Sequence, residues 1–301
     1  MRSLLLFLSR QKQLRRWAET AAIARQLSSR FIAGASLSDA LPAVQKIRSE
    51  GIAITLDYLG EGVTSVTEAA ACRDEYLRAI DALTAAGIEP NVSLKLTQFG
   101  LDLNADLCRQ NVEALVSRVA PQNGFVRVDM ESSEYTDRTL DLVYHLHSRI
   151  PNTGTVIQAY LHRSERDIEE LCSRRIRVRL CKGAYLEPAS VAFPNKADVD
   201  RNFVNLMKRL LEAGTYPAIA THDEAIIEEG CRFVRERNIA RDSFEFQMLY
   251  GIRRDLQRKL TRDGFRLRLY VPYGEAWYPY FMRRLAERPA NVVFLARNLL
   301  R

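Results

Sequence analysis

The segment FVRVDME, residues 125–131, decides the fold of this chain. Side chains alternate between the two faces of a β-strand, so Val126, Val128 and Met130 share one face, and Arg127, Asp129 and Glu131 share the other. Buried charge is costly unless it is paired or functional. The segment therefore predicts a strand that packs on helices through its apolar face and turns a charged face toward a polar interior.

Four further segments repeat this two-faced pattern. In each, an apolar face is expected to pack on outer helices and a polar face to point into a common interior. The polar faces comprise Ser93, Lys95 and Thr97 in 92–97, Arg177, Arg179 and Cys181 in 176–181, Glu245 and Gln247 in 244–248, and Arg268 and Tyr270 in 267–271.

Short apolar segments alternate with helical patterns along residues 51–301. The strand candidates are 52–57, 92–97, 125–130, 155–160, 176–182, 217–221, 244–248 and 267–271. Strand–helix alternation predicts a parallel sheet, and eight such units are what a closed (β/α)8 barrel of the TIM type requires. Residues 1–50 have helical patterns, so we expect an N-terminal helical segment followed by a catalytic barrel at 51–301.

The polar interior divides into two levels. Active sites of such barrels lie at the carboxyl ends of the strands. Four polar residues fall there and are active-site candidates: Lys95, Asp129, Arg179 and Tyr270. Four others lie earlier in their strands and are expected to form a structural ion-pair layer at the bottom of the barrel: Arg127, Arg177, Glu245 and Arg268.

Composition argues against two classes of function. The net charge of +7 over 301 residues is dispersed, with basic residues often beside acidic ones, and no basic stripe or recognition module predicts nucleic-acid binding. The five cysteines include no CxxC pair, so a thiolate metal site is not expected. An odd number of cysteines in a chain of this size favours reduced thiols and a cytoplasmic location.

The first residues, MRSLLLFLSRQKQLRRW (1–17), resemble an amphipathic helix with a basic tail. The apolar run is too short to span a membrane, and no small-residue cleavage site follows it. We expect this helix to pack on the domain or on a second subunit. The alternative is peripheral contact with the inner face of the cell membrane.

Eight segments in order, each at a strand end, resemble the proline dehydrogenases, in particular the bacterial monofunctional type. They are 56–61 (LDYLGE), 92–103 (VSLKLTQFGLDL), 126–132 (VRVDMES), 157–163 (IQAYLHR), 179–185 (RLCKGAY), 220–223 (ATHD), 244–251 (FEFQMLYG) and 268–292. The resemblance implies a flavoenzyme that oxidises L-proline to Δ1-pyrroline-5-carboxylate, the first step of proline degradation.

The resemblance also implies a substrate site. Lys95, Arg283 and Arg284 would clamp the proline carboxylate, a role that suits the planar fork of arginine. Three further side chains would line the substrate pocket: Tyr185, Leu249 and Tyr270. Asp129 would organise the polar network around Lys95, and Glu61 would pair with Arg284 to help close the site.

A non-covalent FAD is implied at the same mouth. Arg179 would lie near the flavin N5 and Gln158 at the pyrimidine side of the ring. Lys182, Gly183 and Ala184 would meet the ribityl chain and pyrophosphate, with Cys181 nearby in place of a more usual aliphatic residue. Thr221 and His222 would contact the phosphate or adenosine side. No GxGxxG follows a strand, so a Rossmann-type site is not expected.

The reaction implied by the resemblance is hydride transfer from proline C5 to the flavin, with electrons passed on to a membrane quinone. The residues alone leave two alternatives open. An interior lysine such as Lys95 is also a candidate for Schiff-base chemistry in a lyase or aldolase. The second alternative is a catalytically inactive barrel that serves as a binding scaffold. The full set of polar residues at the strand ends argues against it.

Overall fold

The strands of the chain are parallel, pair in sequence order and close into a barrel in the computed structural model, which describes residues 29–60 and 62–287. Closure comes from β8 pairing with β1, with Arg268 opposite Ala53. The strands are β1 (Ala53–Tyr58), β2 (Asn91–Leu94), β3 (Phe125–Val128), β4 (Thr153–Gln158), β5 (Arg177–Cys181), β6 (Ala218–Ala220), β7 (Glu245–Leu249) and β8 (Leu267–Tyr273). This confirms the predicted (β/α)8 architecture.

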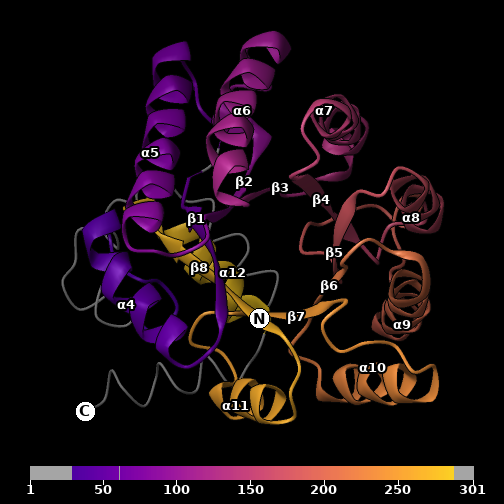
Figure 1. Ribbon diagram of the computed structural model, residues 1–301. Helices are drawn as coiled ribbons and strands as arrows, with labels where there is room; N and C mark the ends of the chain where they lie inside the picture. Colours follow the sequence, from indigo (N-terminus) through magenta and orange to yellow (C-terminus); the bar gives the residue numbers. More distant parts are fainter. Residues whose placement is uncertain (1–28, 61, 288–301) are drawn as a thin grey trace, which may run out of the picture.

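Helices form a ring around the strands (Figure 1). They are α5 (Val66–Ala85), α6 (Ala105–Val119), α7 (Thr136–Arg149), α8 (Ser164–Ser173), α9 (Lys196–Ala213), α10 (Glu224–Glu236), α11 (Arg254–Arg262) and α4 (Leu37–Ser49). Each of α5 to α11 follows a strand, whereas α4 precedes β1. In the ring α4 fills the place between α11 and α5, where it contacts β1 and β8.

Helix α4 has clear sequence signals at its start. Ser36 accepts a hydrogen bond from the Asp39 backbone N–H, and the Asp39 carboxylate accepts one from the Ser36 N–H, so the two residues form a capping box. Ala40, Val44 and Ile47 then lie on one face and are buried against the barrel. The boundary predicted between residues 50 and 51 falls in the turn between α4 and β1, but the division into two domains stays a prediction because residues 1–28 lie outside the described part.

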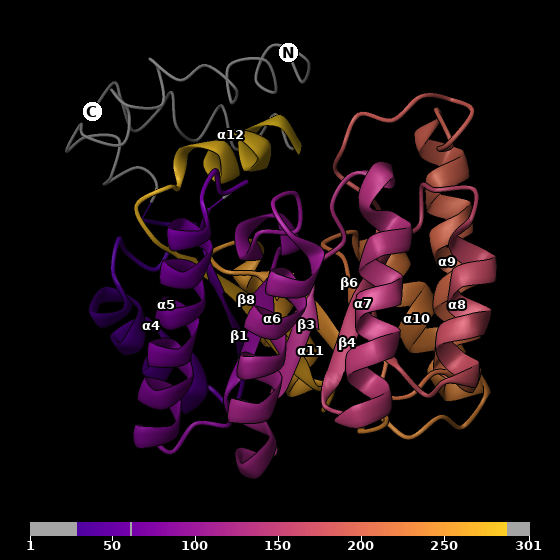
Figure 2. The ribbon, with the colours of Figure 1, turned by 90° about the horizontal axis from the view of Figure 1, so that it is seen from above.

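The last described helix, α12 (Tyr278–Glu287), lies outside the ring. Figure 2 shows it across one end of the barrel. Its first turns belong to a cluster of buried residues that includes Phe31, Ile252 and Tyr280, and Tyr270 of β8 packs against this cluster. Since α4 already covers β8 and β1 on the outside, α12 is available to cover the carboxyl ends of the strands.

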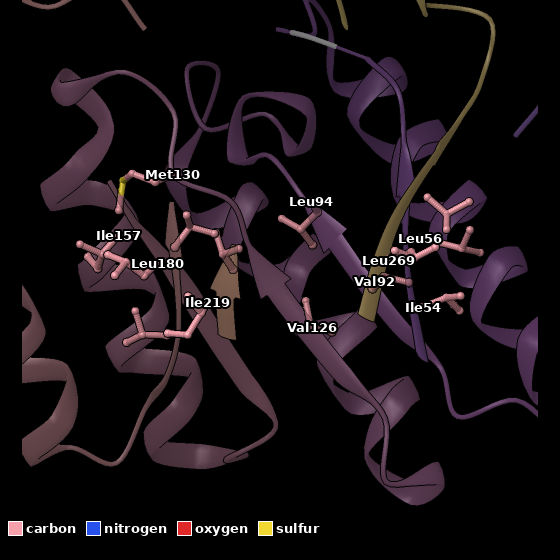
Figure 3. Packing of buried hydrophobic residues seen from close by; sticks show 14 of the residues in the cluster. Ile54, Leu56, Val92, Leu94, Val126, Met130, Ile157, Leu180, Ile219 and Leu269 are labelled. Atoms are coloured by element: carbon pink, nitrogen blue, oxygen red, sulfur yellow. The ribbon is translucent and has the colours of Figure 1, made fainter. Parts of the chain in front are cut away.

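The hydrophobic core lies between the strands and the ring of helices. Side chains such as Leu56, Val126, Leu180 and Leu269 are completely buried there, and Figure 3 shows their packing. The expectation that each strand packs its apolar face on the helices is thereby confirmed, and the opposite faces are left to line the interior of the barrel.

One predicted strand is shorter than its pattern suggested. The polar–apolar alternation of 92–97 continues to Thr97, but β2 ends at Leu94 and residues Leu96–Phe99 form a 3-10 turn. Glu131 fixes this turn, since its carboxylate accepts hydrogen bonds from the backbone N–H and the hydroxyl of Thr97. Lys95 therefore lies at the junction of strand and turn.

The floor of the barrel is an ion-pair layer only in part. Arg268 and Glu245 form the predicted pair, with Nε and Oε1 2.8 Å apart. Arg127 instead donates to the carbonyl oxygens of Thr155 and Arg177, and the Arg177 guanidinium lies over the Phe125 ring. The prediction was wrong for these two arginines, because carbonyl groups and aromatic faces satisfy them in place of carboxylates.

No helix in the described ranges is both long and apolar enough to cross a membrane. The amphipathic helix predicted at residues 1–17 lies outside those ranges, as does Glu61.

Candidate active site

A cavity of about 760 Å³ opens at the carboxyl ends of the strands. A volume of this size is typical of small-molecule and cofactor sites. The cavity lies among the ends of the strands, the segment that follows β5, and Tyr280 of α12. Its lining includes these predicted site residues: Lys95, Asp129, Gln158, Arg179, Cys181, Lys182, Gly183, Ala184, Tyr185, Thr221, His222, Leu249 and Tyr270.

The structure thus brings together the predicted site residues whose side chains it describes. Arg283 and Arg284 lie on α12, the helix across the cavity mouth, but their side chains fall outside the described part, and so does Glu61. The individual roles of these residues stay predictions, since shared location does not establish what each side chain binds.

Arg179 is the centre of the deepest part of the cavity. Its guanidinium donates to Asp129 Oδ1 at 2.8 Å, to Ser93 Oγ at 2.8 Å and to Gln247 Oε1 at 2.5 Å. It also lies over the ring of Tyr270, 5.3 Å from the centroid. These contacts come from three strands and from Asp129, the residue that follows β3. They fix a positive charge in one orientation, as preorganised electrostatic catalysis requires.

Asp129 also joins this network to the hydroxyl group of Tyr270. Its second oxygen accepts a hydrogen bond from the Tyr270 hydroxyl at 3.1 Å. Burial raises the pKa of Asp129, although the charges of Arg179 and Lys95 act in the opposite direction. Burial, together with the negative charge of Asp129, also holds the pKa of Tyr270 well above its ordinary value. Tyr270 therefore remains a neutral hydrogen-bond donor.

Lys95 has a partner that its sequence pattern did not indicate. Its Nζ lies 3.2 Å from Oδ1 of Asp57, a fully buried residue of β1. The signal was present, because Thr55 and Asp57 alternate with apolar residues in Ala53–Tyr58 in the same way as the polar residues of β3. Ser93 and Gln247 were placed on polar faces but received no role, and both bind Arg179.

The outer part of the cavity carries a second group of charges. Lys182 Nζ donates to Asp200 at 2.5 Å and to Asp223 at 2.8 Å. Burial acts to raise the pKa of Asp223, but its hydrogen bond to Lys182 and the charges of Lys182 and Lys196 outweigh this effect and lower it. His222 Nε2 accepts a hydrogen bond from the Leu249 N–H at 2.9 Å, which places a histidine proton on Nδ1 when the ring is neutral.

Gly183 shapes the wall of the cavity. Its φ of +114° lies in a region that favours glycine, and a Cβ at this position would come within 2.3 Å of the Tyr160 ring. The segment after β5 can therefore fold closely over Tyr160. Glu187 secures the same segment by accepting hydrogen bonds from the N–H and hydroxyl of Ser133.

The fold and the cavity together define a (β/α)8-barrel protein with a ligand site at the carboxyl ends of its strands, the arrangement of barrel enzymes. The family model described as proline dehydrogenase matches residues 40–297. The chain belongs to the proline dehydrogenase family and is an oxidoreductase of the monofunctional type.

Relatives of similar length agree with this assignment. The chain is 45% identical to the proline dehydrogenase of Deinococcus radiodurans over 280 residues, which cover 91% of this chain and 90% of that protein. It is 40% identical to proline dehydrogenase 1 of Bacillus subtilis strain 168 over 301 residues, 100% of this chain and 99% of that protein. The resemblance stated from the sequence is thus confirmed.

Solved structures confirm the fold. Proline utilization A (PutA) from Bdellovibrio bacteriovorus, inactivated by N-propargylglycine, superposes with a TM-score of 0.82 at 24% identity. The match covers 95% of this chain but 38% of the PutA chain, so this chain corresponds to one portion of that larger protein. At this identity the similarity bears on the barrel alone.

Proposed function

We propose that the chain oxidises L-proline to Δ1-pyrroline-5-carboxylate with a non-covalently bound FAD in the barrel cavity. Membership of the proline dehydrogenase family supports proline as the substrate. The observation that carries the finer proposal is the network of Arg179, Asp129 and Tyr270, which fixes a cation and an aromatic ring at the deep end of the cavity.

The proline carboxylate would be held by Lys95 together with Arg283 and Arg284. Lys95 lines the cavity, and the two arginines belong to α12, whose Tyr280 also lines it. Tyr270, Tyr185 and Leu249 would enclose the pyrrolidine ring. Fixing the carboxylate and the ring places C5 in one position, so catalysis by these residues is largely catalysis by orientation.

The residues of the cavity fit a flavin dinucleotide. At the deep end Arg179 offers a fixed positive charge and the buried Gln158 an amide for the ring system. In the outer part Lys182, Thr221 and His222 offer hydrogen bonds and charge for the phosphates and adenosine, while Gly183, with Cys181 and Ala184 beside it, admits close backbone approach. When bound, FAD supplies the acceptor for the hydride from proline.

Several wider properties belong to the same proposal. Family resemblance supports a membrane quinone as the final electron acceptor. The odd number of cysteines supports a cytoplasmic location. Peripheral contact of residues 1–17 with the inner face of the membrane is the alternative to packing of that segment on the domain or on a second subunit. A homo-oligomer is compatible with this arrangement.

The direct test is anaerobic reduction of the purified protein by L-proline. The protein should be yellow, release FAD on denaturation, and lose its visible absorbance when proline is added, with the cyclic imine as the product. A colourless protein that cannot be reconstituted with FAD would overturn the proposal.

The Schiff-base alternative has a different signature. It requires a neutral Lys95 amine, whereas the ion pair with Asp57 favours the charged ammonium. Borohydride treatment in the presence of a carbonyl substrate should therefore leave Lys95 unmodified. Covalent labelling at Lys95, found by mass spectrometry of peptides, would favour the lyase.

A further inference from the structure

Asp57 is a buried carboxylate that has no role in the proposed binding of proline or FAD. It lies near the carboxyl end of β1 with none of its surface exposed, and Lys95 Nζ is 3.2 Å from its Oδ1. The Lys95 side chain is itself only 12% exposed. A carboxylate buried this deeply needs compensation, because removing an ion from water costs several kcal/mol.

The other contacts of Asp57 do not supply that compensation. The Tyr76 hydroxyl is 3.4 Å from Oδ1 but 2.7 Å from the Ser93 carbonyl oxygen, so its single proton serves the carbonyl. The second oxygen, Oδ2, has no hydrogen-bond partner among the described residues. In the described part of the chain Lys95 is therefore the cation that neutralises Asp57.

We propose that Asp57 is a positioning residue, which holds the Lys95 ammonium at the edge of the cavity and keeps it charged for the substrate carboxylate. A lysine has a flexible four-carbon stem and loses its proton readily when buried, so it needs an anchor to act as a fixed point charge. Asp57 provides that anchor from a position outside the cavity lining, whereas Lys95 itself lines the cavity. The inference rests on the proposed function, which makes a carboxylate the ligand of Lys95.

Other titratable and charged groups surround this pair, and the test must separate them from Lys95. On α5, burial raises the pKa of Cys72 to about 12 and holds that of Tyr76 well above its ordinary value. On β8, burial does the same for Tyr270. The remaining neighbours are the carboxylates of Asp129 and Glu131, the hydroxyl of Tyr273 and the guanidinium of Arg179. Because burial raises the pKa of Cys72 and of the three tyrosines, these four groups stay protonated between about pH 7 and pH 10. In the same range a buried lysine that has lost its Asp57 partner is expected to release its proton.

The experiment measures the affinity of the FAD-loaded protein for tetrahydrofuran-2-carboxylate, the ether analogue of proline, from pH 7 to pH 10. The analogue has a carboxylate but no amine, so its own charge is constant in this range. Binding can be followed through the change in flavin absorbance. In Asp57→Asn, the pH at which affinity falls should lie at least about one unit below that of the wild type, since a close opposite charge shifts a pKa by 1–3 units.

Two further variants define the outcome. In a Lys95→Arg background, where the cation cannot lose its proton, Asp57→Asn should leave the pH dependence unchanged. The matched control is Asp167→Asn. Asp167 of α8 is another buried carboxylate, and this substitution removes its ion pair with Arg163, whose Nε lies 2.6 Å from Oδ2. It should leave the pH dependence of binding as it is in the wild type.

The possible failures are distinguishable. If the wild type neither oxidises proline nor binds the analogue, the proposed function is wrong. If the wild type does both and Asp57→Asn shows the same pH dependence, the positioning role is wrong. Should Asp57→Asn fail to fold, Asp57→Glu, which keeps the charge, must fold and bind with the wild-type pH dependence. Loss of folding in both variants would assign Asp57 to structure alone and overturn the proposal.

Discussion

The carboxylate of Glu187 accepts two hydrogen bonds from Ser133, one from the backbone N–H at 2.7 Å and one from the hydroxyl at 2.6 Å. The pair joins the segment after β5 to the loop after β3 and so fixes one wall of the cavity. The segment after β5 carries predicted ligand contacts and the loop after β3 carries Asp129, but neither Glu187 nor Ser133 was singled out from the sequence.

Glu187→Ala should weaken FAD binding while leaving the barrel folded. Two partly buried hydrogen bonds hold the wall in place, and losing them should raise the Kd for FAD by about tenfold. Titration of the apoprotein with FAD measures this. Glu134→Ala is the control, since among residues 29–60 and 62–287 Glu134 bonds only the Ser132 hydroxyl and does not line the cavity. Equal losses in both variants would contradict the role assigned to Glu187.

Arg179→Lys should slow flavin reduction by proline at least about a hundredfold, because a lysine cannot keep three fixed hydrogen bonds and an aromatic contact together. Stopped-flow absorbance after mixing with saturating proline gives the rate. The control is Arg177→Lys, two residues earlier on the same face of β5 but on the floor of the barrel. It should reduce the flavin at nearly the wild-type rate, and a comparable slowing there would point to a general defect.

Gly183→Ala should lose FAD affinity by more than can be explained by backbone strain. The added Cβ would collide with the Tyr160 ring, and a positive φ costs an alanine roughly 1–2 kcal/mol. Gly87→Ala separates the two effects, since Gly87 also has a positive φ, +69°, but has nothing within 4 Å of the added Cβ. Both variants should lower the melting temperature slightly, and only Gly183→Ala should fail to retain flavin on a desalting column.

Glu245→Gln should destabilise the barrel by about 3–5 kcal/mol at neutral pH, since it leaves Arg268 buried without its counter-charge. Burial acts to raise the pKa of Glu245, but the charge and hydrogen bonds of Arg268 outweigh it, so the folded-state pKa lies below the ordinary value of 4.5. This stabilisation is therefore complete above pH 4.5 and is lost as the pH falls through the folded-state pKa.

The wild type should accordingly lose stability on acidification below about pH 4.5, while Glu245→Gln should change less over the same range. Urea unfolding at a series of pH values measures both slopes. Parallel slopes would mean that other carboxylates, and not Glu245, govern the acid sensitivity of the barrel.

Periodicity predicted which face of a strand each polar residue occupies, but not its partner. The alternation in β3 and β5 placed Asp129 and Arg179 in a common interior, and eight strand–helix units required the barrel. The partner of Lys95 was missed because it depends on the register between β1 and β2, which sets Asp57 opposite Ser93, two residues before Lys95. No local pattern encodes that register.

Pairings between residues far apart in the chain could not be predicted from the sequence pattern either. Lys182 binds Asp200 and Asp223, which come from the starts of two later helices. On the floor, Arg127 met carbonyl oxygens where a carboxylate had been expected. A charge pattern shows that a residue needs compensation, whereas the twist and closure of the barrel decide which group provides it.

The place of α4 in the ring of helices has a consequence for biosynthesis. During translation β1 and α4 leave the ribosome early, yet the outer edge of β1 gains its neighbour only when β8 has been made. Until then the apolar face of α4 lacks its contacts with β8. A nascent chain stalled before β8 would therefore expose both a strand edge and the apolar face of a helix. Such chains should be strong clients of chaperones that recognise unprotected strands.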